Sequence, residues 1–255
     1  MIPIPKSLTI DRVEKGEKFL LKKSREFVEK SSGDRSKEKY LHASDCLDPR
    51  MAYFTRRYPG PIPDRLVPIF LIGRILHSFI ICGVEGKPFS FDADGGSSTS
   101  KRLRITYSPD MVINGIPREI KTSRSFYEPK EIKDLSMYCE QLLIYMAAMG
   151  KTEGDLWVLF MNAKENGKTS PAFRVYKIRI SKQDLARTQA YLEVLTKDFE
   201  RAMKTKNHKI LPKCRPFKCG KKECEFWDKC KPEGRYGLPD SRWRKNEREL
   251  TVLPN

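Results

Sequence analysis

Three residues whose types could perform chemistry lie close together in SPDMVINGIPREIKTSR, residues 108–124: Asp110, Glu119 and Lys121. Two carboxylates are hard oxygen ligands of the kind that divalent cations prefer. In an extended strand Lys121 shares a face with Glu119, two residues before it. A cation with a neighbouring ammonium group is suited to phosphodiester hydrolysis, because the ammonium can position a water or stabilise charge on a phosphate. The alternative is an ordinary solvated strand edge.

Three further residues extend this pattern on both sides. His77 lies upstream in the apolar stretch GRILHSF, where a lone histidine is more often a core residue than a ligand. Gln141 and Tyr145 lie downstream, four residues apart, so a helix would place them on one face. Either feature alone would be ordinary, but their order around Asp110 and Glu119 favours a common site.

The sequence PD, then EIK, then Q-x-x-x-Y, with His77 ahead of them, resembles the RecB-like branch of the PD-(D/E)XK nucleases over about residues 64–150. The resemblance implies an α/β fold with a restriction-endonuclease-like mixed central sheet flanked by helices. It implies that Mg²⁺ or Mn²⁺ is bound by His77, Asp110, Glu119 and the backbone carbonyl of Ile120. Lys121 would then assist the water, while Gln141 and Tyr145 would position the DNA strand or the lysine.

A second group of residues suited to metal binding is the series C-x₄-C-x₄-C-x₅-C formed by Cys214, Cys219, Cys224 and Cys230. Four thiolates can hold a tetrahedral zinc ion or a 4Fe-4S cluster. The N-terminus lacks the apolar core of a secretory signal, which makes disulfides an unfavoured explanation. Cys82 and Cys139 have apolar neighbours and are expected to be core thiols.

The cysteines resemble those of the AddB nuclease domain and of the iron–sulfur exonucleases associated with CRISPR adaptation. Those proteins use one cysteine ahead of the nuclease core and three behind it. The resemblance implies a 4Fe-4S cluster on Cys46, Cys219, Cys224 and Cys230, joining the N- and C-terminal segments, with Cys214 as a substitute for Cys219. The family's C-x₂-C pair is missing here. The alternative is a zinc knuckle of Cys214, Cys219, Cys224 and Cys230, with Cys46 an ordinary buried thiol.

The formal charge of the 255-residue chain is +17, with a pI near 9.6. Residues 201–250 contain 16 Lys and Arg against 7 Asp and Glu, a net +9. A charge of this size and clustering favours nucleic acid as the partner, bound through backbone phosphates. Basic residues around the cysteines are expected to border the cleft: Lys213, Arg215, Lys218, Lys221 and Lys222.

The elements that must position these residues can be outlined from pattern. A hairpin is predicted around Asn114-Gly115, helices over about 64–79, 134–150 and 181–206, and strands over 155–163 and 172–180. The apolar helix beginning near residue 64 is expected to be buried and to lead into a strand, and no membrane span is expected. We expect one domain over 1–255: an N-terminal helical segment (1–63) with the first cysteine, a nuclease core (64–206), and a basic Cys-rich segment (207–255).

The sequence therefore predicts a cytoplasmic Mg²⁺- or Mn²⁺-dependent DNA nuclease, expected to be an exonuclease acting on single-stranded or end-containing DNA. A recombination or CRISPR-adaptation complex is a possible setting. No G-x-x-x-x-G-K-[ST] motif is present in the sequence, so unwinding would have to come from a partner. The rival hypothesis is a non-catalytic nucleic-acid-binding protein with a zinc knuckle.

Overall fold

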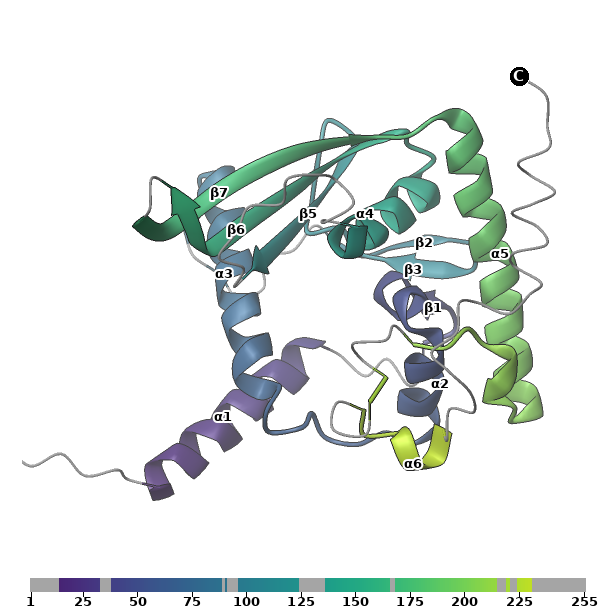
Figure 1. Cartoon of the computed structure of the whole chain (residues 1–255), viewed down its shortest axis with the longest axis horizontal. Coiled ribbons are helices and arrows are strands. Elements are labelled where there is room, and N and C mark those ends of the chain that lie inside the picture. Colours follow the sequence, from purple (N-terminus) through teal and green to yellow (C-terminus); the bar gives the residue numbers. More distant parts are fainter. Residues whose placement is uncertain are drawn as a thin grey trace, which may run out of the picture.

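The computed structural model describes residues 14–32, 38–88, 90, 96–123, 136–165, 168–214, 219–220 and 224–230. Its elements form a mixed α/β fold in which two mixed sheets are flanked by helices (Figure 1). Four of the basic residues around the cysteines, Arg215, Lys218, Lys221 and Lys222, lie outside the described residues.

The larger sheet has the strand order β4-β5-β6-β7, formed by Met111–Ile113, Ile116–Ser123, Glu153–Glu165 and Lys168–Arg179. The hairpin predicted between β4 and β5 is present, and Asn114 and Gly115 both have the positive φ (54° and 72°) that a tight hairpin turn of this kind requires. β5 and β6 are parallel, and helix α4 (Ser136–Met149) lies between them in the chain. Parallel neighbours need such a crossover connection.

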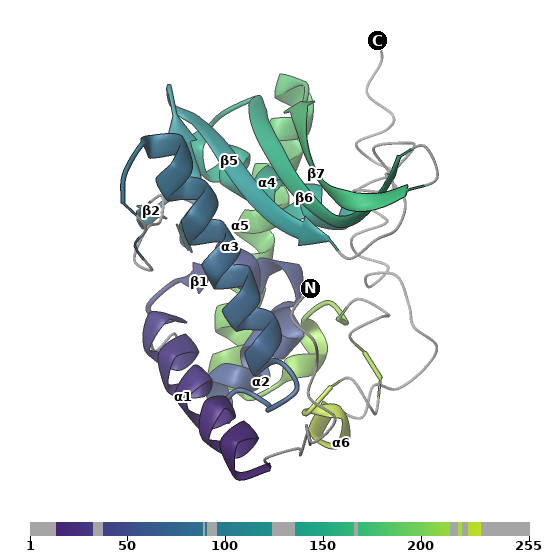
Figure 2. The same ribbon diagram turned by 90° about the vertical axis from the view of Figure 1, so that its left-hand side faces the viewer.

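Helix α4 lies between two hydrophobic cores (Figures 1 and 2). One core lies between α4 and the larger sheet, and the other includes residues of the N-terminal segment and of the C-terminal part of the chain. Leu142 and Met146 belong to the core with Leu156 and Val158 of β6, whereas Tyr145 belongs to the core of the N-terminal segment. A helix that is apolar on all sides, as α4 is, is expected to be buried. This helix therefore links the two cores.

The smaller sheet has the order β1-β3-β2, formed by Leu41–His42, Ile105–Tyr107 and Ser98–Ser100. The 3₁₀ turn η2 (Ala43–Leu47) and helix α2 (Pro49–Arg57) follow β1. Helix α5 (Lys182–Thr205) packs on α2 and α4, and Ser181 caps its N-terminus: the Ser181 hydroxyl accepts a hydrogen bond from the Asp184 amide at 3.0 Å. The short elements η4 (His208–Ile210) and α6 (Trp227–Cys230) come last.

Helix α3 (Val67–Glu85) differs from the sequence prediction in two ways. It continues as a helix through residue 85, with Gly86 as its left-handed C-cap, so no strand begins near residue 80. It is also mostly exposed, for example at Ile72 and Phe79 (53% and 66%), and packs on helix α1 (Glu14–Ser32) and on β5. A uniformly apolar run has no period from which burial or the element type could be read.

By length and mean hydropathy (2.0), α3 is long and apolar enough to cross a membrane, and 22% of its most apolar 18-residue window is buried inside the fold. A single such helix is weak evidence, because core helices of soluble proteins meet the same criterion. In this fold α3 carries His77 at the end of the larger sheet.

Candidate active site and cysteine pocket

The fold brings together, from four parts of the chain, the six residues that are predicted to act through their side chains. His77 lies on α3, Asp110 directly precedes β4, Glu119 and Lys121 lie on β5, and Gln141 and Tyr145 lie on α4. Met111 pairs with Arg118 in the hairpin, so its register sets Asp110 opposite Glu119. The predicted convergence of the two carboxylates therefore follows directly from the Asn114-Gly115 turn.

Both carboxylate oxygens of Asp110 have partners. Its Oδ2 accepts a hydrogen bond from the Ile120 amide at 2.6 Å, and its Oδ1 lies 3.5 Å from Nδ1 of His77. Burial alone would raise the pKa of Asp110, but the contact with His77, the charge of Lys121 and the Ile120 amide outweigh it and lower that pKa. Asp110 is therefore an anion. The contact of Ile120 here is through its N–H, and its carbonyl as a metal ligand stays a prediction.

Glu119 is almost fully buried, at 1% exposure. Its Oε1 pairs with the Lys121 ammonium, while Oε2 is buried and has no hydrogen-bond donor among the described residues. Burial, and then the negative charge of Asp110, raise the pKa of Glu119 to about 8, although Lys121 acts in the opposite direction. A buried carboxylate oxygen that lacks a donor and faces a second carboxylate is suited to a cation.

Lys121 lies in a chain of contacts that ends on helix α4. Its Nζ donates to Oε1 of Gln141 at 3.1 Å, and Nε2 of Gln141 donates to the Tyr145 hydroxyl at 2.6 Å. Burial would lower the pKa of Lys121, but the charges of Glu119 and Asp110 dominate and raise it, so the amine stays protonated. Gln141 and Tyr145 lie one helical turn apart on the same face of α4, as predicted, and they are also in direct contact.

No three His, Cys, Asp or Glu side chains among the described residues lie close enough together to hold one ion as they stand. The donor set around β5 nevertheless fits a divalent cation, because it offers an anionic carboxylate, a second carboxylate with an orphaned buried oxygen, and an imidazole. These are ligand types that Mg²⁺ and Mn²⁺ accept.

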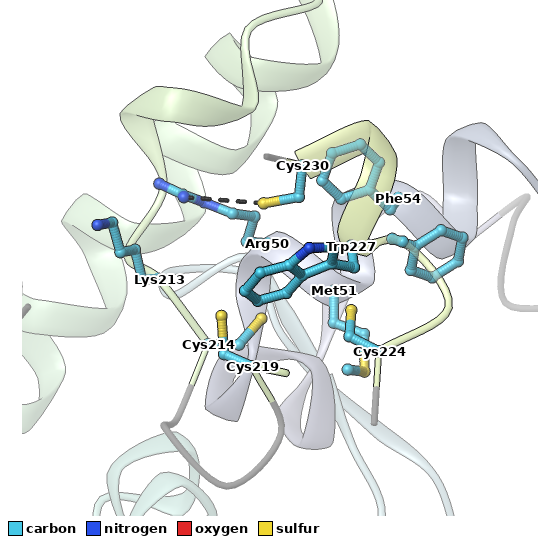
Figure 3. A pocket seen from close by; sticks show the side chains of 10 residues that line it. Arg50, Met51, Phe54, Lys213, Cys214, Cys219, Cys224, Trp227 and Cys230 are labelled. Carbon is cyan, nitrogen blue, oxygen red and sulfur yellow. Dashed lines mark hydrogen bonds between the residues drawn. The ribbon is translucent and has the colours of Figure 1, made fainter. Parts of the chain in front are cut away.

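The second candidate site is a pocket between α2 and the C-terminal segment (Figure 3). Four cysteines line it together with Arg50, Trp227 and other residues: Cys214, Cys219, Cys224 and Cys230. Burial raises the pKa of the Cys214 thiol to about 12, and negative charge on Asp48, Cys224 and Cys219 adds to this effect. The thiols therefore lie close enough to influence one another electrostatically.

Cys46 does not line this pocket. It lies in the η2 turn, where its thiol approaches the carbonyl of His42 at 3.6 Å, and burial raises its pKa. It belongs to the hydrophobic core that Cys224 and Cys230 border from outside. The structure thus groups Cys214, and not Cys46, with Cys219, Cys224 and Cys230. Cys82 and Cys139 are buried, as expected of core thiols.

The C-terminal segment docks on α2 through several contacts. Phe226 stacks on Phe54, with ring centroids 5.5 Å apart, and Nζ of Lys229 lies 3.8 Å from the ring centroid of Tyr58. Arg50, 7% exposed, donates from Nη2 to the Leu211 carbonyl at 2.6 Å, and its Nη1 lies 4.0 Å from Sγ of Cys230. The N- and C-terminal segments are therefore joined by packing and by Arg50.

Sequence reasoning missed Arg50. A charged residue in the first turn of a helix usually faces solvent, and no pattern around Pro49 distinguishes this one. Only a contact between residues 50 and 230 reveals its role, and that contact is a property of the fold. Of the basic residues named around the cysteines, Lys213 lines the pocket.

Comparisons of this chain with protein-family models, with curated proteins and with solved structures give no match. Its functional interpretation rests on its residues and their geometry.

Proposed function

We propose that this chain is a metal-dependent DNA nuclease of the PD-(D/E)XK type, with a restriction-endonuclease-like core. The observation that carries the proposal is the contact network from His77 through Asp110, Glu119 and Lys121 to Gln141. These residues come from separate elements, so a solvated strand edge does not account for their burial and mutual contacts. The hairpin β4–β5, the parallel strand β6 and the crossover helix α4 support the fold assignment.

In the proposed chemistry, His77, Asp110 and Glu119 hold Mg²⁺ or Mn²⁺, with the carbonyl of Ile120 as a further ligand. The ion would supply Lewis-acid stabilisation of the phosphate and lower the pKa of a bound water. Lys121, kept protonated by its carboxylate neighbours, stabilises negative charge or orients the attacking water. Gln141 holds the ammonium in place, and Tyr145 holds Gln141.

DNA is the proposed substrate because the chain carries a net charge of +17. Binding through backbone phosphates requires such a surface and reads little sequence. We propose exonuclease action on single-stranded or end-containing DNA, in the cytoplasm, with a recombination or CRISPR-adaptation complex as the setting. A structural thiolate-bound group, a 4Fe-4S cluster by the resemblance, is the proposed second cofactor.

The test is cleavage of end-labelled linear and circular DNA, single- and double-stranded, by the full chain with Mg²⁺, Mn²⁺ or EDTA. Lys121→Met should lower the cleavage rate by about 10²–10³-fold, the effect of losing one charge-stabilising donor. Asp110→Asn should abolish metal-dependent cleavage. The matched control is Lys204→Met, on the exposed surface of α5, which should cleave normally. Full activity of both Asp110→Asn and Lys121→Met would refute the assignment.

The second candidate function is a non-catalytic nucleic-acid-binding protein with a zinc knuckle. The observation that favours it is the grouping of Cys214 with the other three cysteines of the C-terminal segment. It leaves the network around Glu119 without a role. DNA binding without cleavage under every metal condition, together with bound zinc, would select this alternative.

A further inference from the structure

One side of helix α3 is apolar and exposed. Ile69, Ile72, Leu76 and Phe79 follow one another at intervals of three, four and three residues, the spacing that forms a single stripe along a helix. Ile69, Ile72 and Phe79 are 46%, 53% and 66% exposed, and Leu76 is partly exposed. At the rise of an α-helix the stripe is about 15 Å long. Figure 2 shows α3 on the near side of the molecule, beside α1.

The stripe faces away from the larger sheet. Ile81 is 2% exposed and packs with Met111 and Ile120 of that sheet. Ile72 lies nine residues before Ile81, which is two and a half helical turns, so the two side chains are on opposite sides of α3. The exposure of Ile72 and Phe79 shows that no described element covers this side.

The stripe is also uncharged, although the chain as a whole is strongly basic. From Val67 to Val84 the sequence contains one arginine, one histidine and no acidic residue. The helical period places Arg74 on the side away from the stripe, and Nδ1 of His77 lies 3.5 Å from Oδ1 of Asp110. Binding to nucleic acid requires basic groups in the contact, and a helix that lies on anionic lipid carries them beside its apolar face. The stripe on α3 has neither.

A second copy of this chain offers the surface that fits. Two chains with a charge of +17 repel each other unless their contact excludes charged groups, and the stripe is such a surface. A two-fold contact brings the same patch of each copy together. The exposed parts of Ile69, Ile72, Ile75 and Phe79 amount to about two whole side chains, or roughly 400 Å² per copy at about 200 Å² each. A contact of roughly 800 Å² in total is typical of weak, reversible association.

We propose that two copies of this chain associate through their α3 stripes, with the helices antiparallel about a two-fold axis near Ile75. A parallel pair would bring together both exposed Arg65 residues and both positive N-terminal ends of α3. The antiparallel pair separates these charges and sets Ile72 of each copy beside the partner's Phe79. His77 lies outside the stripe, so each copy keeps it at its own Asp110.

Sedimentation of the full chain, freed of nucleic acid and held in about 0.5 M salt to screen its charge, tests the association. The mean mass of wild type should rise from 29.6 kDa towards twice that value between about 1 and 200 μM. Phe79→Glu should stay at the monomer mass, because association would bury an unpaired charge. The matched control is Phe173→Glu, which replaces a phenylalanine that is 60% exposed on β7 and should associate as wild type does.

Two results would overturn the proposal: a wild type that stays monomeric at the highest concentration, or a Phe79→Glu variant that dimerises as wild type does. The wild-type series alone decides the first of these, even if a variant fails to fold.

A mixing experiment tests the antiparallel arrangement. Ile72→Lys and Phe79→Glu should each be monomeric alone, and an equimolar mixture should dimerise again. In the mixed dimer the new ammonium of one chain meets the new carboxylate of the other, while the second contact between Ile72 and Phe79 stays intact. In a parallel pair the two new charges would not meet. A mixture that stays monomeric would therefore overturn the antiparallel arrangement.

Lipid is the other surface that an exposed apolar helix can contact. Vesicles of phosphatidylcholine alone separate insertion of the stripe from the attraction of a basic chain to anionic lipid. Wild type should not sediment with these vesicles. Sedimentation of wild type with them, lost in Phe79→Glu, would assign the stripe to lipid and overturn the proposal. None of these measurements involves cleavage, so their results are independent of the proposed nuclease activity.

Discussion

Lys121 shows how a single side chain can be placed with little freedom. Its ammonium lies between the Glu119 carboxylate and the Gln141 amide oxygen, and the amide is in turn held by Tyr145, which is 1% exposed. The motif residues could be predicted from sequence because each has a distinctive type and spacing. Their hydrogen-bond order could not be predicted, since it depends on how α4 packs beside β5.

The Gln141 amide is expected to matter for rate more than for folding. In the proposed nuclease, Gln141→Ala should lower kcat by up to about 10²-fold, because a small misplacement of a catalytic group has that effect. Thermal unfolding should change little. The matched control is Gln189→Ala, which loses a similar hydrogen bond, to the Ala147 carbonyl, away from Lys121. Equal kcat values for Gln141→Ala and wild type would exclude the positioning role.

The stability of the metal-free protein should fall as pH rises from about 5 to 8. Glu119 has a pKa of about 8 in the folded chain, against an ordinary value of 4.5. Between these values the folded state binds more protons than the unfolded state, so raising the pH favours unfolding. Thermal melts in EDTA over this range should show the decline.

Two comparisons isolate Glu119 from the neighbouring titratable groups, His77, Asp110 and Lys121. Glu119→Gln keeps the shape of the side chain but cannot titrate, so its melting temperature should decline less over the same pH range. Mg²⁺ or Mn²⁺ should raise the melting temperature of wild type most at pH 8, because a cation that binds only the folded state stabilises it. An identical pH dependence in Glu119→Gln would assign the effect to another group.

At the scale of elements, the sequence predictions held where local signals were strong. The β4–β5 hairpin, α4, β6, β7 and α5 all have turn, cap or periodicity signals, and all are present. The prediction for helix α3 was wrong in both extent and burial, because an apolar run without a period does not reveal whether its residues are buried or exposed. The short strands β1 to β3 depend on pairing between segments far apart in the chain, which no local pattern encodes.

The contact of β6 with α4 leaves no room for a side chain at Gly154. A Cβ atom there would lie 2.9 Å from Cδ1 of Leu142 and 3.2 Å from the sulfur of Met146. Gly154→Ala should therefore destabilise the fold by about 1–3 kcal/mol through overpacking. Denaturant titration gives this free energy directly.

The matched control is Gly83→Ala on α3, where a Cβ atom would meet nothing within 4 Å. This substitution should be neutral or stabilise the fold by up to about 1 kcal/mol, because alanine has the higher helix propensity. If the two alanine variants had the same stability, the close approach of β6 to α4 would be disproved.

At the scale of the whole molecule, the composition can be read from the sequence, but which distant residues lie close together in the fold cannot. The net charge of +17 and the run of four cysteines are visible in the sequence itself. Which four thiols share a pocket is not, because Cys46 lies 168 residues before Cys214 and either could have been brought to the other three. Packing of Phe226 on Phe54 settles how the two segments meet.

If the chain binds DNA as proposed, its overall charge predicts a steep salt dependence of that binding. If the protein contacts six or more phosphates of a duplex, affinity should fall about 10³-fold between roughly 50 and 200 mM salt, with little difference between sequences. Fluorescence anisotropy with an active-site variant such as Asp110→Asn measures binding without cleavage. A shallow dependence combined with strong sequence preference would indicate base recognition instead of phosphate contacts.

The position of Tyr145 couples local unfolding in two parts of the molecule. Its ring belongs to the same hydrophobic core as Phe226 of the C-terminal segment. Its hydroxyl accepts a hydrogen bond from the side-chain amide of Gln141. Any fluctuation that lifts the C-terminal segment from α2 therefore weakens the support of the Lys121 network as well. We expect the backbone amides of α4 and α2 to exchange with deuterium at a common rate, as parts of one cooperative unit. The protein would then lose the geometry of the Lys121 network only when it also releases its cysteine-bearing end.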